Sequence, residues 1–103
     1  MMYKLRVADR AHQDSDSIAE YISTNLDAPT AALDFLDDIA ACYNRLRENP
    51  FLYEVCRDPR LRKEKYRRAV VGNYLVLYKV FEDTNAVIIY RIFYGAQNYT
   101  ELI

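Results

Sequence analysis

The residues with the clearest chemical potential are cations, and many of them fall in one short stretch. Of the 14 lysines and arginines, seven lie between positions 57 and 68: Arg57, Arg60, Arg62, Lys63, Lys65, Arg67 and Arg68. We call residues 57–68 the basic segment. Because the 103-residue chain has a net charge of -1, this cluster is local. It favours one local anionic partner over the general DNA coating expected of a more basic domain.

Tyrosines and one further arginine add to this potential in the C-terminal half. The chain has ten tyrosines, and aromatic and basic side chains on one sheet face can stack bases and neutralise phosphates. For any single strand tyrosine, core packing or a cross-strand pair is the favoured explanation. Arg91 interrupts an otherwise apolar strand, so its charge must reach solvent, a carboxylate or a ligand. An ion pair with a helix carboxylate and a ligand-facing arginine both stay open, and we favour the second slightly.

The remaining reactive residues lack the spacing of a catalytic site. Two glycines cannot build a phosphate-binding loop. His12 is the single histidine, and we expect it on the surface of a helix without a nucleophile beside it. Asp34, Asp37 and Asp38 stand at helical spacing, so we expect a solvated acidic face that suits the helix dipole and not an acid–base pair.

Composition and the number of cysteines limit the classes of protein to which the chain can belong. With 51% hydrophobic and 28% charged residues, the chain has a globular profile. No apolar run approaches the roughly 20 residues of a membrane span, and the N-terminus lacks a signal-peptide stretch. Cys42 and Cys56 do not form a zinc motif, so we expect two reduced thiols. The expectation is a cytoplasmic domain without metal or cofactor.

The N-terminal half predicts one strand and two helices. Alternation over residues 3–7 is typical of a half-buried strand, and apolar residues every four positions predict a helix over about residues 10–24. Pro29 then suits the first turn of a second helix over residues 30–48, which Asn49-Pro50 ends. Its predicted apolar stripe consists of Leu33, Leu36, Ile39, Ala40, Tyr43 and Leu46.

The C-terminal half predicts three strands after a loop over residues 51–64. Residues 66–71, 74–81 and 86–94 are rich in Val, Ile, Tyr and Phe. Gly72-Asn73 fits a type II′ hairpin, with glycine at the first central position.

The expected fold is α+β, a single domain over residues 1–103 with the order β-α-α-β-β-β and a short C-terminal tail. The N-terminal strand and the two-helix hairpin pack on an antiparallel sheet. We expect the first strand at the sheet edge and the helices on one face. The other face is then partly open, and the basic segment enters it.

Three pieces of sequence now carry a resemblance to a known family. They are the two-helix N-terminal half, the segment YRRAVVGNYLVLY at residues 66–78, and the segment RIFYGAQNY at residues 91–99. Together they resemble the RelE/ParE superfamily of type II toxin–antitoxin toxins, also called plasmid-stabilisation proteins, over nearly the whole chain. The resemblance implies a bacterial toxin held inactive by an antitoxin. One branch, like RelE, cleaves messenger RNA in the ribosomal A site, and the other, like ParE, poisons DNA gyrase.

Within this resemblance, the residues favour the ParE-like branch. The RNA-cleaving branch typically carries an arginine after the hairpin tyrosine, where this chain has Leu75. It commonly has basic residues after the glycine of the last strand, and here Ala96 and Gln97 follow Gly95. Tyr94 stands where many relatives have histidine, and a tyrosine with an ordinary pKa near 10 is a poor base at neutral pH.

Three functions stay open on the sequence. The first is a ParE-like toxin that acts by binding gyrase. The second is a metal-independent, RelE-like ribonuclease served by Lys63, Lys65 or Arg67. The third is a non-toxic member of the family, retained as an interaction module. No catalytic residue is assigned.

The expected partners are a cognate antitoxin and, as target, DNA gyrase or ribosome-bound messenger RNA. A homodimer is an open possibility, and no membrane is involved. We expect acidic antitoxin residues to contact the chain between Arg60 and Arg68. The candidate residues for binding target or antitoxin are Arg60, Lys63, Lys65, Arg67, Arg68, Arg91, Tyr94 and Tyr99.

Overall fold

The computed structural model describes residues 2–95 and 97–102. Its elements follow the chain in this order: β1 (Lys4–Val7), α1 (Asp9–Glu20), a π-helical turn η1 (Tyr21–Asn25), α2 (Pro29–Glu48), α3 (Pro59–Lys63), β2 (Arg67–Val71), β3 (Tyr74–Phe81), a 3-10 turn η2 (Glu82–Thr84), β4 (Ala86–Tyr94) and α4 (Tyr99–Leu102). Within this described part, no helix is both long and apolar enough to cross a membrane.

The four strands form one sheet in the order β1-β4-β3-β2. β2, β3 and β4 are an antiparallel meander, as predicted, and β1 lies at the edge, as predicted. β1 pairs with β4 in parallel, so the sheet is mixed and not purely antiparallel. Parallel neighbours need a long crossover connection, which the helices and two strands between β1 and β4 supply. The α+β fold class and the element order are confirmed.

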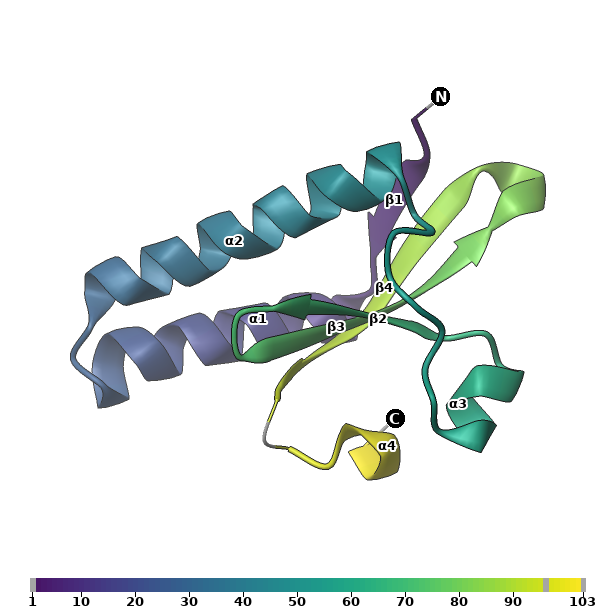
Figure 1. The fold of residues 1–103 in the computed structure, drawn as a ribbon. Coiled ribbons are helices and arrows are strands. Elements are labelled where there is room, and N and C mark those ends of the chain that lie inside the picture. The colour runs from purple at the N-terminus through teal and green to yellow at the C-terminus, as the bar shows by residue number, and fades with distance from the viewer. Residues whose placement is uncertain (1, 96, 103) are drawn as a thin grey trace.

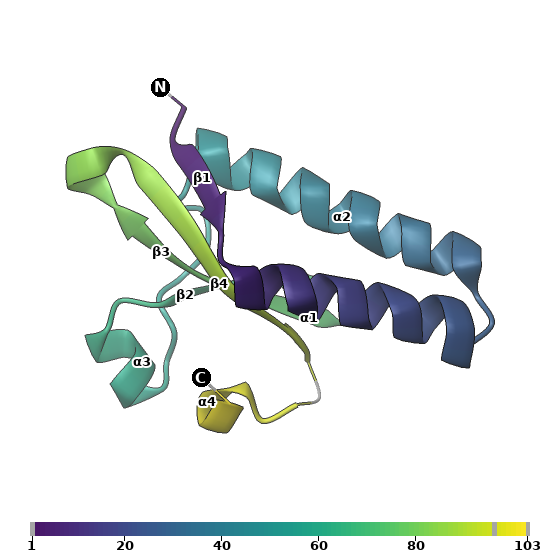
Figure 2. The ribbon, with the colours of Figure 1, turned by 180° about the vertical axis from the view of Figure 1, so that it is seen from behind.

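Helices α1 and α2 cover one face of the sheet as a hairpin (Figure 1, Figure 2). The buried positions of α2 repeat with steps of three and four residues, so one stripe faces the sheet: Ala32, Phe35, Ile39, Cys42 and Leu46. The stripe predicted from sequence was partly wrong, because Leu33 and Leu36 are 64% and 39% exposed and Ala40 is exposed. Two apolar stripes run side by side on α2, and the stripe that contains Phe35 is the buried one. The Phe35 ring contacts the Tyr74 ring of β3, with 4.7 Å between the ring centroids.

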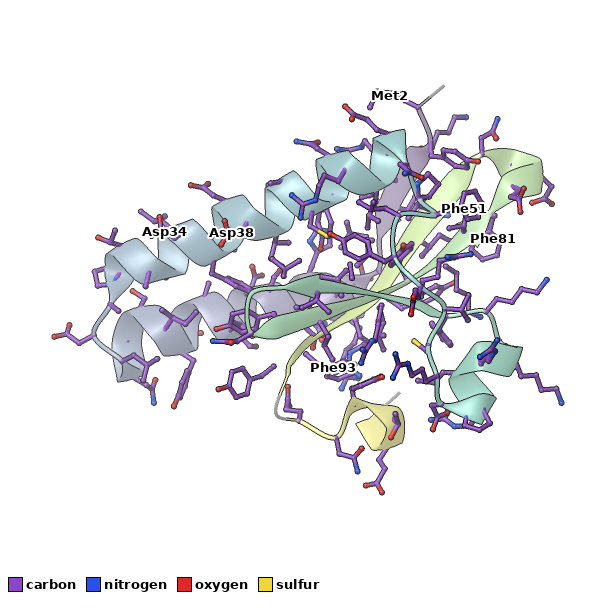
Figure 3. All side chains as sticks on the ribbon, viewed as in Figure 1. Met2, Asp34, Asp38, Phe51, Phe81 and Phe93 are labelled. Atoms are coloured by element: carbon purple, nitrogen blue, oxygen red, sulfur yellow. The ribbon has the colours of Figure 1, made fainter. Side chains whose placement is uncertain are left out.

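The opposite face of the sheet carries a second, smaller core. Cys56, Leu61, Leu77 and Phe93 are buried there, with Tyr66 and Tyr99 packed against them. Helix α3 supplies Leu61 and α4 supplies Tyr99; both helices lie on the side of the sheet away from α2 (Figure 1), and Phe93 points toward α4 (Figure 3). The face expected to be partly open is therefore covered over part of its area.

Local sequence explains α3, which falls in the segment expected to be a loop. The Asp58 side chain caps the helix by accepting hydrogen bonds from the backbone N–H groups of Arg60 and Leu61, both at 3.1 Å. Pro59 stands in the first turn, where its missing N–H costs nothing. A five-residue helix of this kind depends on burying Leu61, because short helices are marginal by themselves.

Candidate functional site

Three of the candidate residues meet at one cavity, at the turn end of the β2–β3 hairpin. The cavity has a volume of about 450 Å³ and is lined by Arg68 of β2, Leu75 of β3, Tyr94 of β4 and Tyr99 of α4, among others. These side chains come from three strands and the C-terminal helix, so only the folded chain brings them together. We call this cavity the basic pocket.

Two glycines shape the rim of the basic pocket. Gly72 has φ of +57° and Asn73 does not have positive φ, which agrees with the predicted type II′ turn. Gly95 donates its N–H to the carbonyl oxygen of Asn73 at 2.6 Å. A Cβ atom at Gly95 would lie 2.9 Å from that oxygen, so a larger residue would push the two backbones apart. The end of β4 is thereby tied to the hairpin turn.

Among the described residues that line the basic pocket, Arg68 is the only charged one. Its guanidinium donates one long hydrogen bond, 3.5 Å, to the hydroxyl of Tyr99. The Tyr99 ring in turn packs against Phe93, with 6.3 Å between the ring centroids. Arg68 is half-buried, so its remaining N–H groups can serve an anion that enters the pocket.

The rest of the basic segment does not converge on this pocket. Arg60 donates to the carbonyl of Thr100 and so holds α4. Arg67 donates to the carbonyl of Tyr53 at 2.7 Å and lies over the Phe51 ring at 5.0 Å. With Lys65, Arg67 lines a separate cavity of about 320 Å³.

Lys63 and Lys65 have exposed side chains. Lys65 follows α3 with φ of +64°, a left-handed conformation that ends the helix. The cations of the basic segment therefore do not all line one cavity: Arg62, Lys65 and Arg67 share one, and Arg68 lines another.

Arg91 is paired with a helix carboxylate. Its Nε lies 2.8 Å from Oδ2 of Asp14, and a second guanidinium nitrogen lies 3.1 Å from Oδ1. The two side chains are only 14% and 13% exposed, and the guanidinium also lies over the Phe93 ring at 4.5 Å. The structure thus favours the ion-pair interpretation over the ligand-facing arginine that we preferred from the sequence.

Most strand tyrosines have packing roles. Tyr78 is fully buried and donates to the carbonyl of Pro50 at 2.7 Å. Tyr66 and Tyr90 meet edge to face at 5.5 Å, and the Lys79 ammonium lies 4.3 Å from the Tyr66 ring centroid. Tyr94 is the exception, because it is 47% exposed at the basic pocket.

The basic pocket has a cation that can bind an anion, but it offers few groups that could act as an acid or a base at neutral pH. Its described lining contains no histidine or carboxylate. Burial, and then the neighbouring Tyr94, raise the pKa of Tyr74, so this phenol stays protonated and cannot act as a base at neutral pH. His12 is exposed on α1, as predicted, and does not line the pocket. Ala96 lies outside the described residues.

Cysteines and carboxylates offer no metal site in residues 2–95 and 97–102, where no three of His, Cys, Asp and Glu gather. Cys42 and Cys56 are free thiols, and they are buried in the two different cores. Burial raises the pKa of Cys42 to about 11, against the opposing effect of Arg45.

Asp34 and Asp38 lie along the outer side of α2 (Figure 3), where both are exposed, in agreement with the predicted solvated face.

A second cavity was not predicted from the sequence. It has a volume of about 710 Å³ and lies between α1 with η1 and the same hairpin end, where Ile18, Tyr21, Leu26 and Tyr94 line it. We call it the apolar groove. The side chains of Tyr21 and Leu26 are 55% and 56% exposed. The π-helical turn η1 changes the helix period, so both side chains leave the core side.

The sequence was compared with protein families and with curated proteins. A family model described as the ParE toxin of type II toxin–antitoxin systems, parDE, matches residues 5–99. A search of curated proteins by sequence found no match.

Two solved structures have a similar fold. One, a chromosomal ParDE toxin–antitoxin system from P. aeruginosa, is 21% identical and has a TM-score of 0.72, over 90% of this chain and 96% of that one. The other, the RelBE2 toxin–antitoxin complex from Mycobacterium tuberculosis, is 18% identical and has a TM-score of 0.66, over 91% and 99%. At these identities the likeness establishes the fold.

Proposed function

The chain belongs to the ParE toxin family of type II toxin–antitoxin systems, and from this premise we propose that it is a cytoplasmic toxin that acts by binding its target. A cognate antitoxin holds it inactive. The observation that carries the proposal is the basic pocket: one cation, exposed aromatic surface, and no histidine or carboxylate among the described lining residues.

Ribonuclease chemistry would need more than this pocket offers. Attack by the 2′-hydroxyl of RNA requires a base, an acid, and positive charge at the crowded phosphate. Leu75 stands in the pocket where the RNA-cleaving branch typically has an arginine, and it is 7% exposed. A buried leucine contributes no charge to a phosphorane.

The proposed target is DNA gyrase, on the strength of the ParE family match. The test uses purified toxin, freed of antitoxin, in two assays side by side. We expect inhibition of gyrase supercoiling or accumulation of gyrase-cleaved DNA, and no cleavage of messenger RNA in a primer-extension assay on stalled ribosomes. Intact transcripts with intact gyrase activity, and no growth arrest on expression, would instead identify a non-toxic interaction module.

One observation keeps a ribonuclease as the second candidate. Arg68 lies beside the Tyr99 hydroxyl, so a cation and a phenol do share one pocket. Lys65 and Arg67 add two cations at the separate cavity of about 320 Å³. A-site cleavage that is lost in Lys65→Ala or Arg67→Ala would overturn the binding mechanism and make this the function.

A further inference from the structure

The basic pocket and the apolar groove are two ends of one trough. They share three lining residues, Asn73, Tyr74 and Tyr94, which lie at the hairpin turn and the end of β4. A ligand that follows the surface past Tyr94 passes from one cavity into the other. The trough therefore curves around the end of the β2–β3 hairpin, because residues of α1 and η1 line one end and Tyr99 of α4 lines the other. Figure 1 shows α1 and α4 on different sides of this hairpin end.

The two ends differ in chemistry. In the apolar groove, no described lining residue is charged, and the large side chains of Tyr21 and Leu26 are more than half exposed. At the other end stands Arg68, half-buried, with a single long hydrogen bond among the described residues. Exposed large apolar side chains that border a cavity mark a surface that a partner covers.

We propose that this trough binds one segment of the antitoxin, with apolar side chains in the groove and a carboxylate at Arg68. The inference rests on the proposed function, because it names the site of the partner that the proposed function requires. Charge complementarity selects an acidic residue at the pocket end. Nucleic acid is disfavoured, since a phosphate backbone running along the trough would meet one cation, Arg68, among the described lining residues.

The trough also indicates which arginine of the basic segment contacts the antitoxin. Arg60 and Arg67 donate to the backbone carbonyls of Thr100 and Tyr53, so their side chains hold α4 and the chain before β2. The Arg68 guanidinium, by contrast, has no backbone carbonyl partner among the described residues and lines the trough. Of these three arginines, Arg68 is the one that recognises the acidic residue of the antitoxin.

The experiment measures binding of the purified toxin to the protein encoded by the adjacent gene, by isothermal titration calorimetry. Trough variants are Leu26→Ser and Arg68→Gln. Each has a matched control outside the trough: Leu33→Ser, an exposed leucine on α2, and Arg62→Gln, an exposed arginine on α3. We expect each trough variant to lose about tenfold or more in affinity, as buried anchor residues do, and each control to bind as wild type does.

The salt dependence of the affinity distinguishes the contribution of the charged end of the trough from that of the apolar end. Arg68→Gln should flatten the fall of affinity with rising salt, because it removes the charge pair, whereas Leu26→Ser should leave the slope unchanged. Arg68→Lys, which keeps the charge, should recover part of the affinity and guards against a folding defect in Arg68→Gln.

The possible failures are distinguishable. Wild-type toxin that binds no protein from the adjacent gene contradicts the proposed function itself. Wild-type binding that both trough variants retain, with equal melting temperatures, leaves the proposed function standing and overturns the trough as the antitoxin site. Loss of binding in Arg62→Gln and Leu33→Ser alone would also overturn it, because it would move the interface to the outer surface of α2 and α3.

Discussion

The ion pair between Asp14 and Arg91 holds α1 against an edge of the sheet that no strand covers. β1 pairs with β4 only as far as Ile89, so the edge of β4 beyond that residue has no partner strand in the described chain. Asp14 takes the place of a strand there. It accepts from the Arg91 guanidinium at 2.8 and 3.1 Å and from the backbone N–H of Ile92 at 2.9 Å.

Arg91→Ala is expected to destabilise the protein strongly. The substitution leaves Asp14, 13% exposed, with the Ile92 N–H but without its cation. Breaking a buried ion pair by removing one partner costs about 3–5 kcal/mol, and the slight exposure of this pair points to the lower figure, about 3 kcal/mol. The total free energy of unfolding of such a domain is about 5–15 kcal/mol, so the substitution removes a large fraction of it. The melting temperature should fall by at least about 12 °C.

The assay is a double-mutant cycle of Asp14→Ala, Arg91→Ala and the double variant, followed by thermal and urea unfolding. Because the two residues share one interaction, we expect the double variant to be clearly less destabilised than the sum of the singles, by about 1 kcal/mol or more. Growth inhibition by Arg91→Ala, measured well below its melting temperature, should persist. Additive losses, an unchanged melt, or a stable protein that has lost toxicity would each refute the structural role.

Three further predictions concern the core and the pocket rim. Tyr78→Phe should lower the free energy of unfolding by about 1–3 kcal/mol in urea unfolding, because the buried carbonyl of Pro50 loses its 2.7 Å partner. Gly95→Ala should loosen the end of β4, because its Cβ meets the Asn73 oxygen at 2.9 Å; faster hydrogen exchange of the Gly95 amide would reveal this, and unchanged exchange would contradict it. Stability should fall as pH rises from 9 to about 11, because the Cys42 thiol ionises from its ordinary pKa of 9.0 when unfolded but only near 11 when folded. Urea unfolding across this range should show a shallower fall in Cys42→Ala, and an equal slope in both proteins would exclude Cys42 as the cause.

The sequence predicted the elements well where one physical signal dominated. The β-branched and aromatic runs of β2, β3 and β4 leave little choice of conformation, and glycine at the first turn position specifies the hairpin type. It predicted α2 correctly as a helix but misplaced its buried stripe. Leu33 and Phe35 belong to adjacent apolar stripes, and only packing against Tyr74 decides between them.

The candidate site was predictable only in part. Arg68, Tyr94 and Tyr99 were candidates and do line one pocket. Arg91 was also a candidate, but its partner Asp14 lies 77 positions away in the chain, and local sequence carries no signal for such a pair. The apolar groove escaped prediction because a π-helical turn interrupts the regular helix period on which periodicity arguments depend.

The sequence by itself determined the fold class, the order of elements, the local excess of positive charge and the family. The first three follow from short-range signals, namely side-chain period, turn residues and composition, whereas the family rests on the match of residues 5–99 to a family model. Tertiary structure alone decided which cations point outward, which apolar stripe is buried, and which residues share a cavity. Arg60, Arg67 and Arg68 are close in sequence, yet Arg60 and Arg68 contact α4, through the Thr100 carbonyl and the Tyr99 hydroxyl, whereas Arg67 contacts the Tyr53 carbonyl in the segment before β2. Those partners are brought near by long-range packing of the sheet, which depends on the whole chain and not on any local stretch of it.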